Sequence, residues 1–132
     1  MMLNIAICDD RPLQRELLNI LIHEYEEENE VCFNIYQFSS GEELLVKFDE
    51  DRKFFDLFFL DYYMKRLTGL ETALHIRSFS KACPIVFVTA AEKCDFMEAI
   101  PFEVLFKPAQ KVDLNKILER VLVRKIGKDE GI

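Results

Sequence analysis

The stretch Phe54-Phe55-Asp56-Leu57-Phe58-Phe59-Leu60, followed by Asp61, decides how the rest of the chain is interpreted. The run is nearly all apolar, which is typical of a parallel strand covered by helices on both faces. It is also far too short to cross a membrane. Asp61 then lies at the carboxyl end of the strand, which is where open α/β sheets bind their ligands. The sequence therefore predicts a functional carboxylate at Asp61.

The composition is that of one globular domain, because 50% of the 132 residues are hydrophobic and 31% are charged. A chain of this length supports one packed core and is too short for two ordinary domains. Its net charge of −7 argues against a free-standing nucleic-acid-binding module, which needs a basic face, and suits a bound cation. The N-terminal sequence has no signal peptide or membrane span, so we expect no membrane contact and a cytoplasmic location.

The cysteines are Cys8, Cys32, Cys83 and Cys94, which are widely spaced and include no Cys-x-x-Cys pair. This spacing favours reduced thiols over a disulfide framework or a zinc site. Reduced thiols are also what a cytoplasmic protein contains.

Apolar runs alternate with helix-like segments along the whole chain. Strands are expected at 3–8, 31–38, 54–60, 84–88 and 102–106, and helices at 12–28, from Ser39 or Ser40 through Phe48, at 70–79, at 90–100 and at 112–122. For the first helix, the expected buried face comprises Leu13, Leu17, Leu21 and Tyr25, with Leu18 and Ile20 beside them. Such alternation predicts a parallel sheet with right-handed crossovers and helices on both faces. We expect one domain at 1–125, followed by a frayed tail or the start of a linker at 126–132.

Polar side chains stand at the carboxyl ends of four predicted strands: Asp9, Asp10, Asp61, Thr89 and Lys107. In a parallel sheet these ends share one edge, so the side chains should converge. Two carboxylates about 5 Å apart repel by roughly 3 kcal/mol at an effective dielectric of about 20, so such a cluster needs a cation or a proton. Oxygen ligands favour Mg2+, while an ammonium and a hydroxyl suit a phosphoryl group, which aspartate is able to accept covalently.

Each of these residues also has an ordinary structural explanation. Asp9, Asp61 or Thr89 taken alone would be a helix cap or a solvated turn residue, and Lys107 alone a surface lysine before a proline. These explanations weaken because all of them would have to hold independently at the same edge. His23 and His75 lie within helices away from that edge and are expected to be surface or packed histidines.

Together these motifs resemble the receiver domain of a two-component response regulator, over essentially the whole chain. The matching signals are Asp9-Asp10, Asp61 with Met64 and Gly69 after it, Thr89-Ala90, and Lys107-Pro108. The segments at 4–10, 38–45 and 56–61 are similar to receivers that precede LytTR-type DNA-binding domains.

The resemblance implies an α/β, flavodoxin-like (βα)5 three-layer sandwich with strand order 2-1-3-4-5. It also implies that Asp61 accepts a phosphoryl group from a sensor histidine kinase or a small phosphodonor, and so switches a partner or an output domain, with transcription as the expected output. DNA would be contacted only through such an output domain, and the chain would be no enzyme beyond its own phosphorylation and dephosphorylation.

The same resemblance assigns roles to individual residues. Mg2+ would be held by Asp10 and Asp61 directly, by Asp9 through water and by the backbone carbonyl of Tyr63. Lys107 would hold one phosphoryl oxygen, and Thr89 would move inward to bind another. The bond before Pro108 is expected to be cis, which an X-Pro bond permits at low cost.

Two residues depart from the family pattern. Lys65 replaces the usual proline after Met64, and Val104 replaces the usual switch aromatic. Because Val104 is small and stiff, we expect the signal to run through displacement of the segment 90–100. The outer surface of that segment, with the fifth strand and the last helix, would form a homodimer or partner interface.

Two other functions remain open at this stage. A phosphatase with an aspartyl nucleophile needs a second aspartate two residues after the first, where this chain has Tyr63. A degenerate receiver that acts only as a protein-interaction module is the other alternative, suggested by Lys65 and Val104. A phosphorylation assay separates both from a working receiver.

Overall fold

The computed structural model describes residues 2–90 and 97–129. Its centre is a parallel sheet of five strands in the order β2-β1-β3-β4-β5. The strands are β1 (Leu3–Cys8), β2 (Phe33–Phe38), β3 (Leu57–Asp61), β4 (Ile85–Thr89) and β5 (Glu103–Phe106). The predicted parallel sheet and its strand order are confirmed.

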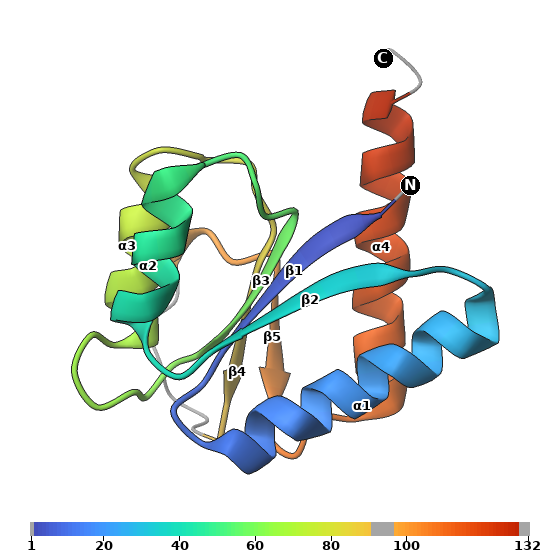
Figure 1. Ribbon diagram of the computed structural model, residues 1–132, viewed down its shortest axis with the longest axis horizontal. Coiled ribbons are helices and arrows are strands. Elements are labelled where there is room, and N and C mark those ends of the chain that lie inside the picture. The colour runs from blue at the N-terminus through green and yellow to red at the C-terminus, as the bar shows by residue number, and fades with distance from the viewer. Residues whose placement is uncertain (1, 91–96, 130–132) are drawn as a thin grey trace.

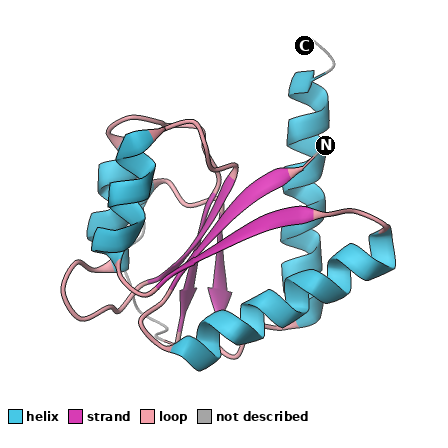
Figure 2. Ribbon diagram, viewed as in Figure 1, coloured by secondary structure: helices cyan, strands magenta, loops and turns pink. Residues whose placement is uncertain are grey.

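Helices cover both faces of the sheet. They are α1 (Pro12–Asn29), α2 (Gly41–Glu50), α3 (Gly69–Arg77) and α4 (Lys111–Asp129), with a short 3-10 turn, η1, at Met97–Ala99. In Figure 1, α1 and α4 lie on one side of the sheet, and α2 and α3 lie on the other. Figure 2 shows the resulting three layers of helix, strand and helix. In the part of the chain that the structure describes, no helix is both long and apolar enough to span a membrane.

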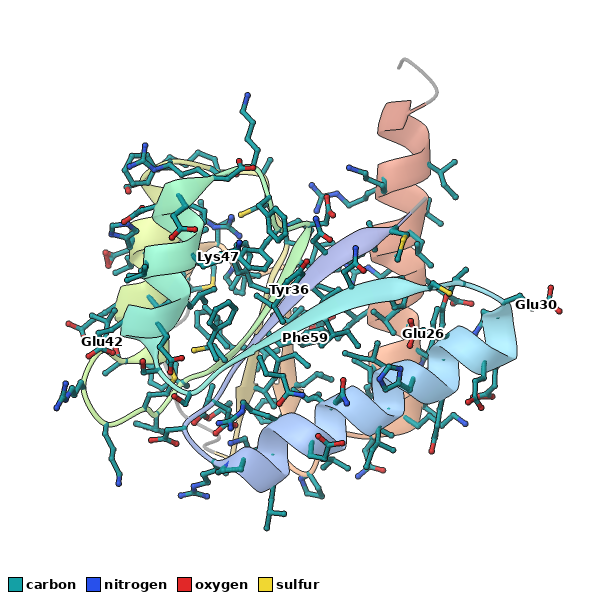
Figure 3. The ribbon with its side chains drawn as sticks, viewed as in Figure 1. Glu26, Glu30, Tyr36, Glu42, Lys47 and Phe59 are labelled. Carbon is teal, nitrogen blue, oxygen red and sulfur yellow. The ribbon has the colours of Figure 1, made fainter. Side chains whose placement is uncertain are left out.

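Successive residues of the central strands pack into two different cores. Ile5 and Ile7 of β1 join the core beneath α1 and α4, whereas Ala6 and Cys8 join the core beneath α2 and α3. Every residue of β3 is buried, which confirms the prediction of a strand covered on both faces. Figure 3 shows Phe59 of this strand among the side chains between the sheet and α1.

Side-chain caps begin the two helices on the α2 and α3 side. Ser40 caps α2 by accepting a hydrogen bond from the Glu43 backbone N–H. Thr68 and Glu71 form a reciprocal capping box at the start of α3. Caps of this kind contribute about 1 kcal/mol each. The cap of α3 stabilises the end of the loop that follows Asp61.

The buried face of α1 differs from the one predicted from the sequence. The buried residues are Leu18, Ile22 and Tyr25, whereas Leu13 is 83% exposed and Ile20 is 48% exposed. Apolar residues cover a wide arc of this helix, so periodicity alone did not locate the centre of the buried stripe. The α1 helix is therefore rotated relative to the expectation and presents Leu13 to solvent.

The α4 helix continues to Asp129, into the segment 126–132 that was expected to be a frayed tail or the start of a linker, and residues 130–132 lie outside the described part of the chain. Residues near its end contact the loops that precede β3 and β4: Lys125 Nζ lies 3.2 Å from Asp56 Oδ1, and Arg124 Nη2 donates to the Ala82 carbonyl at 2.9 Å. These partners are distant in sequence, so no local pattern indicated them.

The structure differs from the sequence prediction at the end of α3, and it describes only part of the helix expected at 90–100. The α3 helix ends at Arg77, two residues before the expected Phe79, and Ser78 closes it with backbone hydrogen bonds. Of the helix expected at 90–100, residues 91–96 lie outside the described residues. The described remainder is the 3-10 turn η1 followed by Ile100.

Candidate functional site

The carboxyl edge of the sheet brings the predicted acidic residues together. Asp9 and Asp10 follow β1, and Asp61 is the last residue of β3. Each offers one carboxylate oxygen, and these three oxygens lie within 4.8 Å of one another. Asp9 and Asp61 are buried, and Asp10 is half-buried. The convergence expected from a parallel sheet is therefore present.

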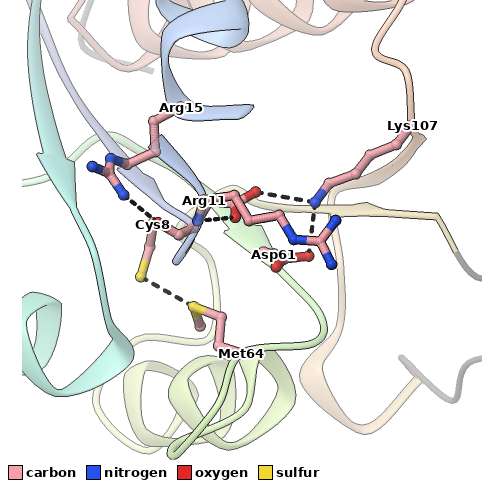
Figure 4. Close-up of polar contacts among 7 residues, drawn as sticks. Cys8, Arg11, Arg15, Asp61, Met64 and Lys107 are labelled. Atoms are coloured by element: carbon pink, nitrogen blue, oxygen red, sulfur yellow. Dashed lines mark hydrogen bonds and ion pairs between the residues drawn. The ribbon is translucent and has the colours of Figure 1, made fainter. Parts of the chain in front are cut away.

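Lys107, directly after β5, places its ammonium between two of these carboxylates. Its Nζ lies 3.1 Å from Asp9 Oδ2 and 3.2 Å from Asp61 Oδ1 (Figure 4). The lysine side chain is only 11% exposed, so solvent screens these pairs less than it screens pairs on the surface. The Lys107–Pro108 peptide bond is cis, as expected.

Asp9 is also fixed by contacts that the sequence did not reveal. Its Oδ1 accepts a hydrogen bond from the Arg11 backbone N–H at 2.9 Å. Its carbonyl oxygen accepts one from Arg15 Nη1 at 2.7 Å. Arg15 lies in α1 and has the sequence context of an ordinary helical arginine, so no signal marked it. These contacts hold the turn that carries the acidic pair.

The electrostatic surroundings of Asp61 are unfavourable to its charge. Burial, followed by the charge of Asp9, raises the pKa of the Asp61 carboxyl from 3.8 to about 6, and Asp10 adds to this. Lys107 acts in the opposite direction but does not cancel the shift. Without a further cation, the cluster holds a proton far more readily than an isolated aspartate does.

Cys8 and Met64 form the floor of the site on the α2 and α3 side. The Cys8 Sγ lies 3.6 Å from the Met64 Sδ (Figure 4). Burial, together with the charges of Asp9 and Asp61, raises the pKa of the Cys8 thiol to about 12. This thiol is therefore protonated and unreactive at neutral pH, as the prediction of a buried structural thiol requires.

The loop after Asp61 forms one wall of an open cleft. Its residue Tyr63 is 60% exposed, and Met64 is buried. With Asp10, Arg11 and Lys65, these residues line a cleft of about 410 Å3. Lys65 thus lines the same cleft as Asp10.

Thr89 ends β4 beside the site and is fully buried. Its carbonyl oxygen accepts a hydrogen bond from the Lys107 backbone N–H at 2.8 Å, which joins the two strand ends. The two histidines lie elsewhere, as expected: His23 contacts Glu26 within α1, and His75 of α3 contacts Asp49.

This fold and site define a class of signalling protein. Residues 5–119 match the model of the response regulator receiver domain, so the chain belongs to that family. It is a receiver domain of a two-component response regulator.

Individual relatives place the chain more closely. The sensory transduction protein LytR of Staphylococcus epidermidis is 30% identical to it over 117 residues, which cover 87% of this chain and 44% of that protein. The chain therefore spans less than half the length of this curated relative.

Solved structures share the fold. Chemotaxis protein CheY4 of Vibrio cholerae has a TM-score of 0.76 at 24% identity, and the match covers 92% of this chain and 99% of that one. A response regulator receiver domain protein from Clostridium thermocellum has a TM-score of 0.80 at 22% identity, covering 93% and 96%.

Proposed function

We propose that Asp61 is the phosphoacceptor of this receiver and that a sensor histidine kinase is its donor. A carboxylate oxygen of Asp61 attacks the phosphorus, the bond from phosphorus to the histidine nitrogen breaks, and that nitrogen leaves with the electron pair. A small acyl phosphate serves as donor in the same way. The observation that carries this proposal is the position of Asp61: it is buried, 3.2 Å from an ammonium, and one of three converging carboxylates.

The donor set fits Mg2+. Three carboxylates and one ammonium leave two negative charges at the site, which one divalent cation balances. All available ligand atoms are hard oxygens, the type that Mg2+ prefers. We propose that Asp10 and Asp61 bind the ion directly, with Asp9 acting through water and Tyr63 through its backbone carbonyl. The bound ion would supply positive charge for the phosphoryl oxygens.

Lys107 and Thr89 complete the proposed site. In the structure the Lys107 ammonium pairs with both Asp9 and Asp61, so it is already placed to contact an oxygen of a group attached to Asp61. Thr89 belongs to the strand next to Asp61 and would contribute its hydroxyl to another phosphoryl oxygen. Catalysis by such a site is mainly positioning and charge stabilisation.

The test is a mass measurement after incubation with acetyl phosphate and Mg2+. The protein should gain one phosphoryl group, and the Asp61→Asn variant should gain none. Asp113→Asn, an exposed position on α4, is the matched control and should behave as the parent. A parent protein that gains nothing would favour a receiver that acts only as an interaction module.

We further propose that the chain acts as a phosphoacceptor and has no turnover on an external substrate. Tyr63 occupies the place where an aspartyl phosphatase needs its second carboxylate, and its side chain is 60% exposed. Release of inorganic phosphate from added phosphomonoesters should therefore stay at the background rate. Turnover that depends on Asp61 would contradict this assignment.

The segments at 4–10, 38–45 and 56–61 are similar to receivers that precede LytTR-type DNA-binding domains. On this ground we propose a transcriptional output, carried by an output domain in the same protein or by a partner. DNA would then be bound by that domain only. The proposed homodimer surface comprises β5, α4 and the segment before β5. Phe106, 54% exposed, and a cleft of about 550 Å3 over β5 and α4 support this location.

A further inference from the structure

Arg77, the last residue of α3, is a buried arginine that has no carboxylate partner among residues 2–90 and 97–129. It is 4% exposed, and the acceptors of its guanidinium within the described part of the chain are uncharged. Nε donates to the Ala99 carbonyl at 2.6 Å and Nη2 to the Ile100 carbonyl at 2.7 Å. Nη1 donates to the carbonyl oxygens of Cys83 at 2.7 Å and Ser80 at 3.2 Å. Burying a charge costs its hydration, so the guanidinium depends on these carbonyl oxygens for its hydrogen bonds. The same hydrogen bonds join α3 to the backbone at 80–83 and 99–100.

The segment that Arg77 holds contains an unusual backbone conformation. Ile100 has a φ of 51°, in the left-handed region that β-branched residues rarely adopt. Pro101 follows it, and a residue before proline favours extended conformations. The Ile100 side chain is 53% exposed, so core packing does not hold the residue in place. Two hydrogen bonds restrain this conformation: Arg77 Nη2 donates to the Ile100 carbonyl, and the Ile100 N–H donates to the Met97 carbonyl at 3.1 Å.

Ile100 is connected to the phosphoacceptor site through one short strand. The Phe102 N–H donates to the Ile85 carbonyl at 2.8 Å, which begins the pairing of β5 with β4. Four residues later the strand ends, and Lys107 contacts Asp61. Pro101 has a fixed φ, which limits how far it can absorb a displacement of β5. Ile100, directly before it, can absorb one by leaving its strained conformation.

We propose that Arg77 is a positioning residue that holds Ile100 in the left-handed conformation, and that phosphorylation favours a state in which this hold is released. The inference rests on the proposed phosphorylation of Asp61. A group added to Asp61 draws new contacts from Lys107, the displacement passes along β5, and Ile100 relaxes. The strength of the hold then sets the population of the state that binds a phosphoryl group well.

This proposal predicts opposite effects for two substitutions. Arg77→Lys keeps the charge but loses the forked geometry, so the hold weakens and the released state becomes more populated. Affinity for beryllium trifluoride with Mg2+, an analogue of the phosphoryl group, should rise by about threefold to tenfold. Asparagine tolerates the left-handed conformation, so Ile100→Asn should increase the population of the held state. The affinity for beryllium trifluoride should then fall by about threefold to tenfold.

Isothermal titration calorimetry measures both affinities, with urea unfolding as a second readout. Ile100→Val, which keeps the β-branch, should match the parent, as should Arg52→Lys at an exposed arginine in the turn after α2. If Arg77 only stabilised the fold, Arg77→Lys would lower stability, and the two substitutions would not shift the affinity for beryllium trifluoride in opposite directions. Equal affinities, or shifts of the same sign, would therefore overturn the inference.

The failure of this inference is distinguishable from failure of the proposed function. A parent protein that binds the analogue, with variants that bind it equally well, removes only the role of Arg77. A parent protein that neither binds it nor accepts a phosphoryl group removes both proposals. If Arg77→Lys does not fold, the comparison of Ile100→Asn with Ile100→Val still decides the matter.

Discussion

A Cβ atom added at Gly69 would lie 2.0 Å from the carbonyl oxygen of Asp61. The Gly69 N–H also donates to the Tyr62 carbonyl at 2.9 Å, so the first turn of α3 packs directly against the peptide that follows the proposed acceptor. Only a residue without a side chain fits this contact. The position of Asp61 therefore depends on backbone packing as well as on its own strand.

The first prediction concerns this contact. Gly69→Ala should displace the Asp61 backbone, lower the free energy of unfolding by about 1–3 kcal/mol, and slow phosphorylation by acetyl phosphate roughly tenfold to a hundredfold. Gly41→Ala is the matched control, because its Cβ would meet the Thr72 hydroxyl oxygen at 2.2 Å, away from Asp61. That variant should lose stability but keep its phosphorylation rate. Equal rates in both variants would contradict the prediction.

The second prediction concerns pH and the metal-free protein. Because the folded pKa of Asp61, about 6, exceeds its ordinary value of 3.8, the folded state binds this proton more tightly than the unfolded state. Stability should therefore fall as the pH rises from about 4 to about 6, and then level off. Asp61→Asn cannot ionise and should exceed the parent by about 1–2 kcal/mol above pH 6, allowing for the lost contact with Lys107.

Urea unfolding in a chelator between pH 4 and pH 8 measures this difference. Asp113→Asn again serves as the control and should follow the parent at every pH. A stability gain for Asp61→Asn that is the same at pH 4 and pH 8 would show that its origin is not the ionisation of this carboxyl.

The third prediction ranks the two acids after β1. Both Asp9 oxygens already have partners, Oδ1 the Arg11 N–H and Oδ2 the Lys107 ammonium. Asp10 has no side-chain hydrogen bond among the described residues and lines the open cleft. Asp10→Asn should therefore lower Mg2+ affinity by about tenfold or more, and Asp9→Asn should lower it less. Metal titration of both variants tests the ranking, and equal losses would reverse it.

The fourth prediction separates two contacts of one carboxylate. Asp56 Oδ2 accepts from the Asn4 backbone N–H at 2.8 Å, while its Oδ1 pairs with Lys125. Asp56→Ala leaves a partly buried N–H without this partner and should cost about 1–3 kcal/mol. Lys125→Met removes only an ion pair whose lysine is 35% exposed, so it should cost less than about 1 kcal/mol. Urea unfolding compares them, and similar costs would show that the ion pair dominates.

The fifth prediction concerns the switch surface. The difference in hydrogen exchange with and without beryllium trifluoride should be largest in residues 97–106, because η1 and β5 directly precede Lys107, which contacts Asp61. The loop at 62–68 is the internal comparison. If the change is confined to that loop, this receiver signals through another surface.

The sequence was sufficient for the sheet and for most of the site. Long apolar runs such as 54–60 identify buried strands, and a parallel sheet has one carboxyl edge, so the convergence of Asp9, Asp61 and Lys107 followed from topology. The sequence did not predict features that depend on contacts between residues distant along the chain. Arg77 has the pattern of an ordinary basic residue in the last turn of a helix, and nothing local indicates that it reaches Ala99 and Ile100.

The same reason explains the errors in the helices. Seven apolar residues spread around α1 left several possible buried faces, and only contact with the sheet selects the one centred on Ile22. For α4, hydrophobic periodicity fades after Leu122, yet the helix continues, and Arg124 and Lys125 have partners in the loops that precede β4 and β3.

The length of α4 gives the chain a mechanical property. Its 19 residues, at about 1.5 Å each, make a rod about 28 Å long that starts four residues after Lys107. Such a rod is a lever: a tilt of about 10° at Lys111 carries the far end through about 5 Å. Beyond the buried residues Leu114, Ile117, Leu118 and Val121, the helix is held by the Lys125–Asp56 ion pair, whose lysine is 35% exposed, and by the Arg124 hydrogen bond to the Ala82 carbonyl. A tilt of α4 near Lys107 would therefore produce its largest displacement at the far end of the helix.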